Sequence, residues 1–412
     1  MIFDALIIGA GPAGSTTALL LATAGWSVGL VEKQVFPRRK VCGEFISATS
    51  LPLLQKLGIA DFYLQDSGPE VRRVGLFAAN TVIASAMPPA NHSLSNWGRA
   101  FGREHLDSAL LARAVSAGVT LWQPWVINSL ERKAGLFTAT VAANEQTTTI
   151  TARVVIMAQG SWERGIGCSA KVYPHQPADL LAFKAHFKNA TLAPDLMPLL
   201  AFPGGYGGMV HSSDKRVTLS CCIRRDTLET IRKQHLGLPA AEAVLRHIKA
   251  SCLGVREVLA DAERVDKWLA AGPIRPGIRK CYEDGVFFVG NIAGEAHPIV
   301  AEGISMAMQS GWLLAEVLIA GKKELFSGKN IDLAGQKYTK QWRVHFANRI
   351  HAAAFFSKIA IRPWAVMFLL PLVKQFPGIL TFGAKLSGKI KQVVFHHSSP
   401  LPLWERSTRS GG

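Results

Sequence analysis

A glycine-rich turn near the start of the chain constrains the fold more than any other feature of the sequence. Residues 3–8 form a short apolar run that leads into the pattern Gly-x-Gly-x-x-Gly over residues 9–14, and residues 15–24 follow as an Ala- and Leu-rich helix. A second strand over residues 26–32 ends in an acid, Glu32. This order of strand, glycines, helix, strand and acid predicts a Rossmann-like βαβ unit that binds a dinucleotide.

Each position in this unit has a physical role. The first glycine permits a tight turn, the second lets a pyrophosphate approach the backbone, and the third lets the helix pack close to the strand. The helix N-terminus offers free N–H groups and a positive dipole end to the phosphates, and Glu32 lies where an acid binds ribose hydroxyls. The unit therefore assigns seven residues to the cofactor: Gly9, Gly11, Pro12, Ala13, Gly14, Glu32 and Lys33.

The segment directly after this unit distinguishes FAD from NAD. Residues 36–44 read Phe-Pro-Arg-Arg-Lys-Val-Cys-Gly-Glu. They resemble the Arg-x-Lys-x-Cys-Gly segment of the geranylgeranyl-reductase-like branch of the para-hydroxybenzoate hydroxylase superfamily of flavoproteins. The resemblance implies that FAD is the cofactor, that Arg39, Lys40, Cys42 and Gly43 lie beside it, and that Glu44 contacts the substrate.

Three further segments are similar to this superfamily in the expected order. Arg103, in a segment over residues 102–107 that opens a helix, matches an arginine that lies against FAD. Gln159 and Gly160 stand where the family usually has Asp-Gly, a position linked to FAD and NAD(P)H contacts. An amide still hydrogen-bonds but carries no charge. This change weakens the argument for nicotinamide binding more than the argument for FAD.

The third segment resembles the second FAD fingerprint of the family. It covers residues 285–294 and 297–307, with Gly290 followed by Asn291 where Asp is usual. Gly303 and Ile304 would begin a helix aimed at the flavin, and a helix N-terminus there stabilises negative charge on reduced flavin. These residues complete the predicted cofactor site.

Four side chains are candidates for chemistry or substrate contact. Cys42 is either a thiol that acts beside the flavin, with a pKa lowered by neighbouring basic residues, or a small buried residue that fits there. His297 is either a general acid or base, or a turn histidine. Glu302 is either a catalytic carboxyl with a raised pKa or a helix cap. Tyr206, in a glycine-rich segment similar to one of the reductase branch, either contacts substrate or belongs to the core.

The predicted fold class is α/β with two domains. A Rossmann-like FAD-binding domain (residues 1–75, 98–170 and 275–335) interleaves with a mixed β-sheet substrate domain (residues 76–97 and 171–274). A helical C-terminal segment over residues 336–395 follows, and the aperiodic residues 396–412 are expected to form a disordered tail.

Charge is concentrated at the C-terminal end. The formal net charge is +17, and residues 322–412 hold 15 Lys/Arg and 3 Asp/Glu. No nucleic-acid-reading motif accompanies this charge, so nucleic acid is not an expected partner. A solvated helical face is the plainer interpretation. The alternative is peripheral membrane contact through residues 340–392, with Trp364, Phe368 and Leu369 inserted into lipid.

The six cysteines form no CxxC pair and no zinc-type cluster, so neither a metal site nor a disulfide framework is expected. They read as reduced thiols of a cytoplasmic protein, and no signal peptide is evident. No run of 18 uncharged apolar residues occurs, so a spanning helix is not expected.

The resemblance implies an FAD-dependent oxidoreductase, and several reactions remain open. The first prediction is monooxygenation of a hydrophobic or aromatic secondary metabolite, and the alternative is reduction of prenyl double bonds. Halogenation ranks third, because Trp122 and Trp125 do not match the Trp-x-Trp-x-Ile-Pro motif of halogenases. A flavin-binding protein without catalytic activity is a further class. NADPH, NADH or a separate reductase would supply the electrons.

Overall fold

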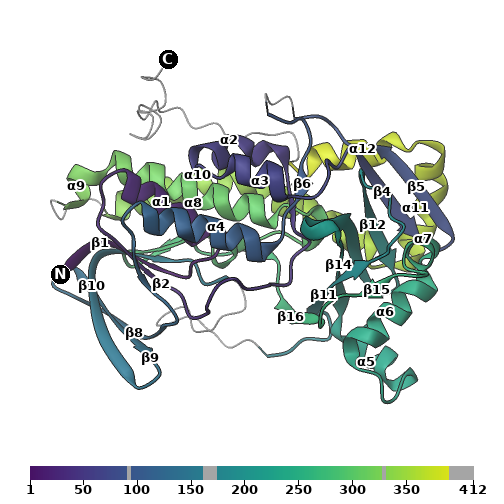
Figure 1. Ribbon diagram of the computed structural model, residues 1–412, viewed down its shortest axis with the longest axis horizontal. Helices are drawn as coiled ribbons and strands as arrows, with labels where there is room; N and C mark the ends of the chain where they lie inside the picture. Colours follow the sequence, from purple (N-terminus) through teal and green to yellow (C-terminus); the bar gives the residue numbers. More distant parts are fainter. Residues whose placement is uncertain (91–93, 161–173, 327–330, 389–412) are drawn as a thin grey trace.

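The computed structural model describes residues 1–90, 94–160, 174–326 and 331–388. The predicted tail over residues 396–412 lies outside the described residues. Within them the chain forms two sheets, each covered by helices, and a C-terminal group of helices that spans both (Figure 1). The predicted fold class, an α/β protein with two interleaved domains and a helical extension, is confirmed.

The first sheet contains the dinucleotide unit. Its strand order is β18-β19-β10-β1-β2-β7, and the central strand β1 pairs in parallel with both β10 and β2. A parallel strand covered on both faces needs a nearly continuous apolar sequence, which residues 3–8 provide. The strands are β1 Ile2–Ile8, β2 Val28–Val31, β7 Thr120–Trp122, β8 Val126–Lys133, β9 Leu136–Ala143, β10 Gln146–Met157, β18 Tyr282–Glu283 and β19 Val286–Phe288.

Three helices pack together over this sheet: α1 (Pro12–Thr23), α4 (Arg103–Ser116) and α8 (Gly303–Ala320). Helix α8 approaches α1 closely because Gly311 has no side chain. A Cβ there would lie 2.5 Å from the carbonyl oxygen of Ala13. The close packing fixes the N-termini of the two helices relative to each other, and both N-termini face the cofactor segments.

The second sheet has the order β15-β11-β14-β13-β12-β4-β5, with β16 on β11. Its strands are β4 Arg73–Ala78, β5 Thr81–Ala86, β11 Leu180–Lys188, β12 Leu196–Phe202, β13 Gly205–His211, β14 Val217–Arg224, β15 Glu263–Arg264 and β16 Leu269–Ile274. It therefore begins at Arg73, slightly before the predicted boundary at residue 76. Two short ladders complete the strands: β3 Phe45–Ile46 with β6 Arg99–Ala100, and β17 Gly277–Ile278 with β20 Gly294–Glu295.

The remaining helices outside the C-terminal group are α2 Leu51–Lys56, α3 Ala60–Asp66, α5 Arg225–Gln234, α6 Ala240–Ser251, α7 Leu253–Val258 and α9 Lys322–Phe326. The sequence predicts one helix from residue 240 to 259, and the structure has two. Cys252 separates them with extended backbone (φ −133°, ψ 106°), and its thiol donates to the carbonyl oxygen of Ala201 at 3.4 Å. The break brings α7 against the second sheet.

The C-terminal group consists of α10 (Ile331–Ala360), α11 (Pro363–Gln375) and α12 (Gly378–Leu386). The first part of α10 packs on α8. The side chains on its packed face recur at helical spacing, and all of them are buried: Tyr338, Trp342, Phe346, Ile350 and Ala353. Helix α12 reaches β4 and β5 of the second sheet, where Thr381 Oγ1 donates to the carbonyl oxygen of Ala86 at 2.7 Å. The group thus connects the two domains.

Among the described helices, α8 is long and apolar enough to cross a membrane, and 67% of its apolar window is buried inside the protein. Helices α10 and α11 reach the same threshold only together, and the chain bends by 100° between them.

Candidate active site at the junction of the two sheets

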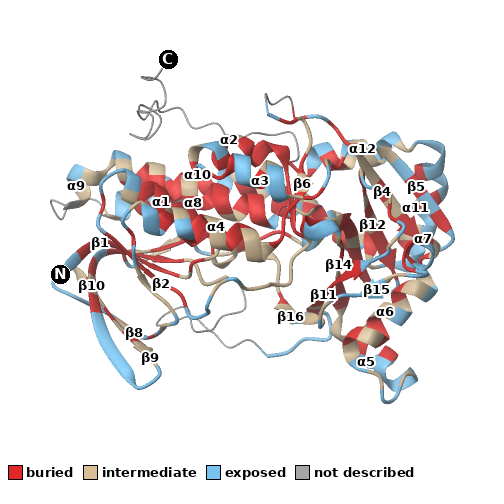
Figure 2. Cartoon of the chain, in the orientation of Figure 1, coloured by how far each residue is buried: buried red, intermediate tan, exposed pale blue. Residues whose placement is uncertain are grey.

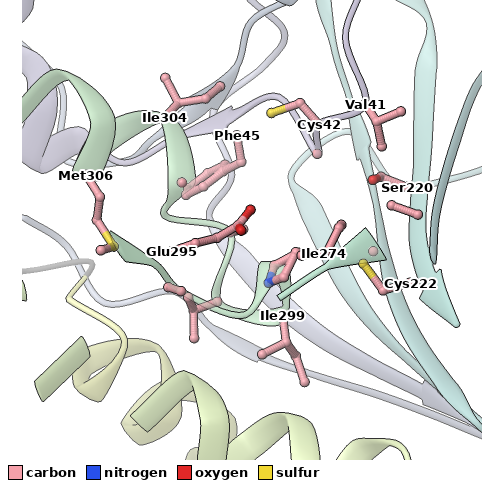
Figure 3. Close-up of a pocket in the computed structure, with 18 of the residues that line it drawn as sticks. Val41, Cys42, Phe45, Ser220, Cys222, Ile274, Glu295, Ile299, Ile304 and Met306 are labelled. Atoms are coloured by element: carbon pink, nitrogen blue, oxygen red, sulfur yellow. The ribbon is translucent and has the colours of Figure 1, made fainter. Parts of the chain in front are cut away.

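A cavity of about 700 Å³ lies between the two sheets and the C-terminal helices. Figure 3 shows Cys42, Glu295 and Ile304 from the first domain around the same space as Ser220 and Cys222 from the second sheet. The predicted cofactor segments line one part of this cavity. Side chains of α10, α11 and α12 line another part.

The dinucleotide unit adopts the geometry that its sequence predicts. Gly9 has φ +106°, and a Cβ there would lie 2.7 Å from the carbonyl oxygen of Ala158. At Gly14 a Cβ would lie 1.9 Å from the carbonyl oxygen of Gly9. Gly11, Pro12 and Ala13 line the cavity, whereas Gly14 serves the helix–strand contact.

Glu32 closes the end of this unit. One of its carboxylate oxygens accepts from the backbone N–H of Ala10 and the other from that of Gln34, both at 2.9 Å. Each oxygen keeps further acceptor capacity for a ribose hydroxyl. Glu32 and Lys33 both line the cavity, and their contact with a ribose stays a prediction.

The basic segment after Glu32 contributes a different arginine from the predicted one. Arg39 pairs with Asp266 of the substrate domain and does not line the cavity. Arg38 lines it instead, with its guanidinium 3.6 Å from Glu32 and 3.6 Å from Asp107. The sequence held the signal, because Arg38 is the arginine that aligns with the Arg-x-Lys-x-Cys-Gly pattern. Lys40 also lines the cavity.

Arg103 lines the cavity at the start of α4 and forms two 2.7 Å hydrogen bonds to the carboxylate of Asp107. Burial lowers the pKa of the Arg103 guanidinium, but the Asp107 carboxylate outweighs burial and raises this pKa above its usual range. The pair fixes a planar cation in the cofactor part of the cavity. Such a cation suits a pyrophosphate.

The thiol of Cys42 lies in the electrostatic range of the Arg103 guanidinium, and its Sγ accepts from the backbone N–H of Glu44 at 3.4 Å. Cys42 is half-buried and, with Gly43, lines the cavity. Arg39 and Lys40 were the basic residues expected beside the thiol, but Arg39 pairs with Asp266 and Arg103 interacts with the thiol instead. Cys42 therefore lies on the cavity wall beside a buried cation.

The second FAD segment surrounds the middle of the cavity. Gly290 (φ +69°) brings its backbone near Ala13, since a Cβ there would lie 3.0 Å from the Ala13 side chain. Asn291 donates from Nδ2 to Glu295 Oε1 at 2.9 Å. Gly290, Asn291, Gly303 and Ile304 all line the cavity. At Gly303 the first turn of α8 faces open space, because nothing lies within 4 Å of its added Cβ.

Glu295 is a cavity carboxylate that the sequence analysis did not single out. It is 5% exposed, lies in the short strand β20, and projects into the cavity (Figure 3). Its other oxygen is 3.6 Å from the guanidinium of Arg279. The sequence offered one indication of its role, namely its position three residues after Ile292 in the second FAD segment. A single acid in a loop belongs to no periodic pattern, so this position did not identify it.

Two predicted catalytic residues lie beside the cavity rather than on its wall. Glu302 is fully buried just before α8, in the electrostatic range of Arg349 on α10, and does not line the cavity. His297 lies behind the wall, with its Nδ1 3.3 Å from the hydroxyl of Tyr206. Burial and the charge of Lys358 lower the pKa of His297 to about 4, so this imidazole is neutral at neutral pH.

Tyr206 lines the cavity from β13, directly opposite Cys222 of β14. It is 1% exposed, and burial raises the pKa of its phenol well above the usual value. Its ring forms part of the second-sheet wall, as expected for a substrate-facing residue or a core aromatic. Both interpretations agree with its position.

Glu44 is engaged by the protein itself. Its carboxylate pairs with Lys184 and accepts from His186 at 3.2 Å, Ser212 at 2.8 Å and Thr218 at 2.6 Å. Burial raises the pKa of Glu44, but Lys184 and His186 outweigh burial and bring it well below its usual range. The carboxylate is therefore engaged within the protein, and the contact of Glu44 with substrate stays a prediction.

The same cluster contains the one group of side chains in the described residues that satisfies the spacing of a metal site. Glu44, Glu104 and His186 have ligand atoms within 4.8 Å of one another. The Lys184 ammonium already supplies a positive charge there and is fully buried. We therefore interpret the cluster as an ion-pair network that holds the Cys42 segment against the second sheet.

The residues present fit FAD. Gln159 lines the cavity, and its buried Oε1 has no hydrogen-bond partner among the described residues. Such an atom calls for a donor from a bound group, since a buried acceptor left unpaired is unfavourable. Gly160 adjoins it with φ +89°. Hydrogen-bond donors, hydrogen-bond acceptors and closely packed backbone segments thus line the same end of the cavity.

Comparison with known proteins supports this reading of the site. Residues 3–332 match a family model described as an FAD binding domain. A digeranylgeranylglycerophospholipid reductase of Methanopyrus kandleri is 26% identical over 87% of this chain and 87% of its own length. Conditioned medium factor receptor 1 of Dictyostelium discoideum is 26% identical over 84% of this chain and 68% of its own length.

Solved structures share the fold at low identity. The myxobacterial chondrochloren halogenase has a TM-score of 0.76 at 19% identity, over 97% of this chain and 94% of its own. A geranylgeranyl bacteriochlorophyll reductase-like protein of Thermoplasma acidophilum has a TM-score of 0.68 at 20% identity, over 93% of this chain and 99% of its own. The chain belongs to the FAD binding domain family and is an FAD-dependent oxidoreductase of the para-hydroxybenzoate hydroxylase superfamily, in its geranylgeranyl-reductase-like branch.

Proposed function

We propose that this protein reduces carbon–carbon double bonds in a long, apolar, isoprenoid-like lipid. The observation that carries the proposal is the continuity of the cavity. It runs from the FAD segments past Cys42 to a wall made of apolar side chains of α10, α11 and α12, among them Phe356, Leu369 and Val373. A wall of this kind binds a flexible hydrocarbon chain through burial of its apolar surface.

FAD, when bound and reduced, supplies a hydride. The chain's own residues position the reactants and supply the proton. The Cys42 thiol donates its proton to the second carbon of the double bond, and the resulting thiolate beside the Arg103 cation regains a proton from solvent. Arg103 and the α8 N-terminus favour negative charge in this part of the cavity.

The names of relatives agree with this assignment. Besides the archaeal lipid reductase, a menaquinone reductase of Mycolicibacterium smegmatis is 23% identical over 83% of this chain and 82% of its own length. Both named substrate classes contain isoprenoid chains. Cys42 lies in the segment that resembles the reductase branch, and the structure brings it to the cavity wall.

The test uses FAD-loaded protein reduced anaerobically with dithionite, which removes the need to know whether NADPH, NADH or a separate reductase is the natural donor. Geranylgeranyl diphosphate and menaquinone serve as probes, and mass spectrometry of the products should show a gain of two hydrogen atoms per reduced bond. Cys42→Ala should lower this turnover about 10²-fold, the usual contribution of a general acid, with flavin retained. Cys252→Ala removes a buried thiol outside the cavity and is the matched control.

Monooxygenation is the second candidate, and one observation favours it. The neutral His297 beside the buried Tyr206 hydroxyl could orient a phenolic substrate at the cavity wall. In air and with an alkylphenol as probe, hydroxylation would give a product that carries one oxygen atom from labelled dioxygen. Such a product, with no saturated lipid in the anaerobic assay, would overturn the reductase proposal.

A further inference from the structure

Helix α11 is apolar around its whole circumference although it lies on the surface. Leu370 and Val373 face inward, whereas Trp364 and Phe368 are 68% and 81% exposed. A surface helix of a water-soluble domain ordinarily presents polar residues outward. A helix that is apolar on both sides therefore requires an apolar environment on its outer side as well.

Helix α12 and the turn before it extend this surface. We define the outer apolar face as Trp364, Met367, Phe368, Leu372, Phe376 and Phe382, all of them exposed. Figure 2 shows the exposed outer sides of α11 and α12 at the end of the molecule away from the first sheet. Contiguous exposed apolar surface of this kind marks an interaction site.

The charged residues in the stretch of chain that carries this face are all basic. No Asp or Glu occurs between residues 333 and 404. Lys358, Arg362, Lys374 and Lys385 are exposed on the same helices. Exposed aromatic and aliphatic side chains accompanied by basic residues alone complement a bilayer with anionic headgroups.

The structure also narrows the segment that the sequence suggested for membrane contact. Residues 338–353 of α10 pack against the FAD-binding domain, and Leu369, expected to insert into lipid, lines the cavity instead. Within the described residues, the contact surface is consequently limited to α11, α12 and the end of α10; residues 389–392 of the suggested segment lie outside the described residues.

We propose that the outer apolar face docks on an anionic lipid bilayer and opens the cavity toward it. Phe355 and Ile379 are 61% and 39% exposed, and both also line the cavity. The cavity mouth therefore adjoins the docked face. A lipid substrate passes from the bilayer into the cavity between these helices without crossing water, and this holds for reduction and hydroxylation alike.

The experiment is sedimentation of the full-length protein with vesicles of phosphatidylcholine, with and without one part in three of phosphatidylglycerol. The wild-type protein should sediment with the anionic vesicles and be released by high salt, which screens the headgroup attraction. The double variant Phe368→Gln with Phe382→Gln should bind at least about tenfold more weakly, because two large apolar side chains no longer enter the lipid. Lys374→Glu with Lys385→Glu should weaken binding by more than about fivefold per residue.

Two matched control variants distinguish binding through the outer apolar face from non-specific binding to vesicles. Leu236→Gln replaces an apolar residue that is 87% exposed on the substrate domain, and Lys233→Glu reverses an exposed charge on α5. Both should bind vesicles like the wild type. Flavin absorbance and the melting temperature of every variant show that it is folded.

Vesicle binding requires no turnover, so its result is independent of the proposed reaction. A wild-type protein that stays in the supernatant with anionic vesicles would overturn the proposal, and so would face variants that bind like the wild type. Self-association that the face variants abolish, without any vesicle binding, would show that a second copy covers the face and would equally reject the bilayer.

Discussion

The two ends of the cavity are built by different means. At the cofactor end, backbone lies against backbone: Gly9 and Gly14 each bring main-chain atoms to distances that a side chain would prevent. At the substrate end, the wall consists of interchangeable apolar side chains of α10, α11 and α12. A steric constraint of the first kind tolerates no substitution, whereas an apolar wall of the second kind tolerates many.

From this contrast between the two ends of the cavity, we expect the largest effect of a substitution at Gly14. Gly14→Ala places a methyl group 1.9 Å from a carbonyl oxygen within the βαβ turn, so the helix must move away from the strand. We expect no folded protein that retains flavin, measured by soluble yield and by flavin absorbance after gel filtration. Gly25→Ala is the control: its φ is also positive (+75°), but nothing lies within 4 Å of the added Cβ. It should cost about 1–2 kcal/mol and keep the flavin.

A second prediction concerns the network between the domains. Glu44→Gln leaves the fully buried Lys184 ammonium without its carboxylate and should lower the free energy of unfolding by about 3–5 kcal/mol. Chemical denaturation followed by fluorescence measures the loss. Lys184→Met should cost less, because Glu44 keeps His186, Ser212 and Thr218 as partners. An equal decrease in the free energy of unfolding in the two variants would contradict the expectation that removing the carboxylate costs more than removing the ammonium.

The same carboxylate sets an acid limit on stability. Because its pKa is lowered in the folded protein, Glu44 stabilises the fold above the pKa of the unfolded state, about 4.3, and this contribution is lost as pH falls further. The wild-type protein should therefore lose stability below that pH more steeply than Glu44→Gln.

These contrasts also explain how far the sequence could predict the structure. The βαβ unit follows a fixed order of glycines, apolar strands and an acid, so Gly9 and Glu32 were predicted from local pattern, whereas Gly290 and Gly303 were predicted from the family resemblance. Arg38 could also have been chosen over Arg39 from the sequence, because only Arg38 occupies the arginine position of the Arg-x-Lys-x-Cys-Gly pattern.

The other parts of the site could be assigned only from the tertiary structure. Glu295 reaches the cavity from a two-residue strand, and Glu44 meets Lys184 across 140 residues of sequence. The helical period of α10 was readable, but the sequence assigned Leu369 to the outer surface. Inner and outer faces of α11 are equally apolar, so periodicity cannot distinguish the side that lines the cavity.

A third prediction tests the tolerance of the apolar wall. Leu370→Ala should lower the free energy of unfolding by about 2 kcal/mol, at the small end for a buried leucine, because this residue borders an existing cavity. Flavin content should be unchanged, and the Michaelis constant for a lipid probe should rise. Leu228→Ala, at a buried site of the second sheet's helical side, serves as the control for stability without contact with the cavity. Loss of flavin in Leu370→Ala would show that the two ends are not separable.

The smallest effect at neutral pH is expected for His297, which changes the stability of the fold only as pH falls. Since its pKa is lowered from 6.5 to about 4 in the folded protein, the unfolded chain takes up the proton first. Stability should therefore decline as pH falls from about 6.5 toward 4. Its neighbour Tyr206 stays neutral across this range, because burial raises the pKa of its phenol well above the usual value. His297→Gln should flatten this part of the melting-temperature profile, and an unchanged slope would assign the decline to other groups.

Helices α10, α11 and α12 follow the cofactor segments in the chain, and this order has a consequence for biosynthesis. The parallel sheet needs strand β19 (Val286–Phe288), and the first turn of α8 follows soon after it, so every glycine and carboxylate of the cofactor end leaves the ribosome before the lipid wall does. Domains fold progressively from the N-terminus during translation. The cofactor end can accordingly fold before α10, α11 and α12, which line the other part of the cavity, have been synthesised.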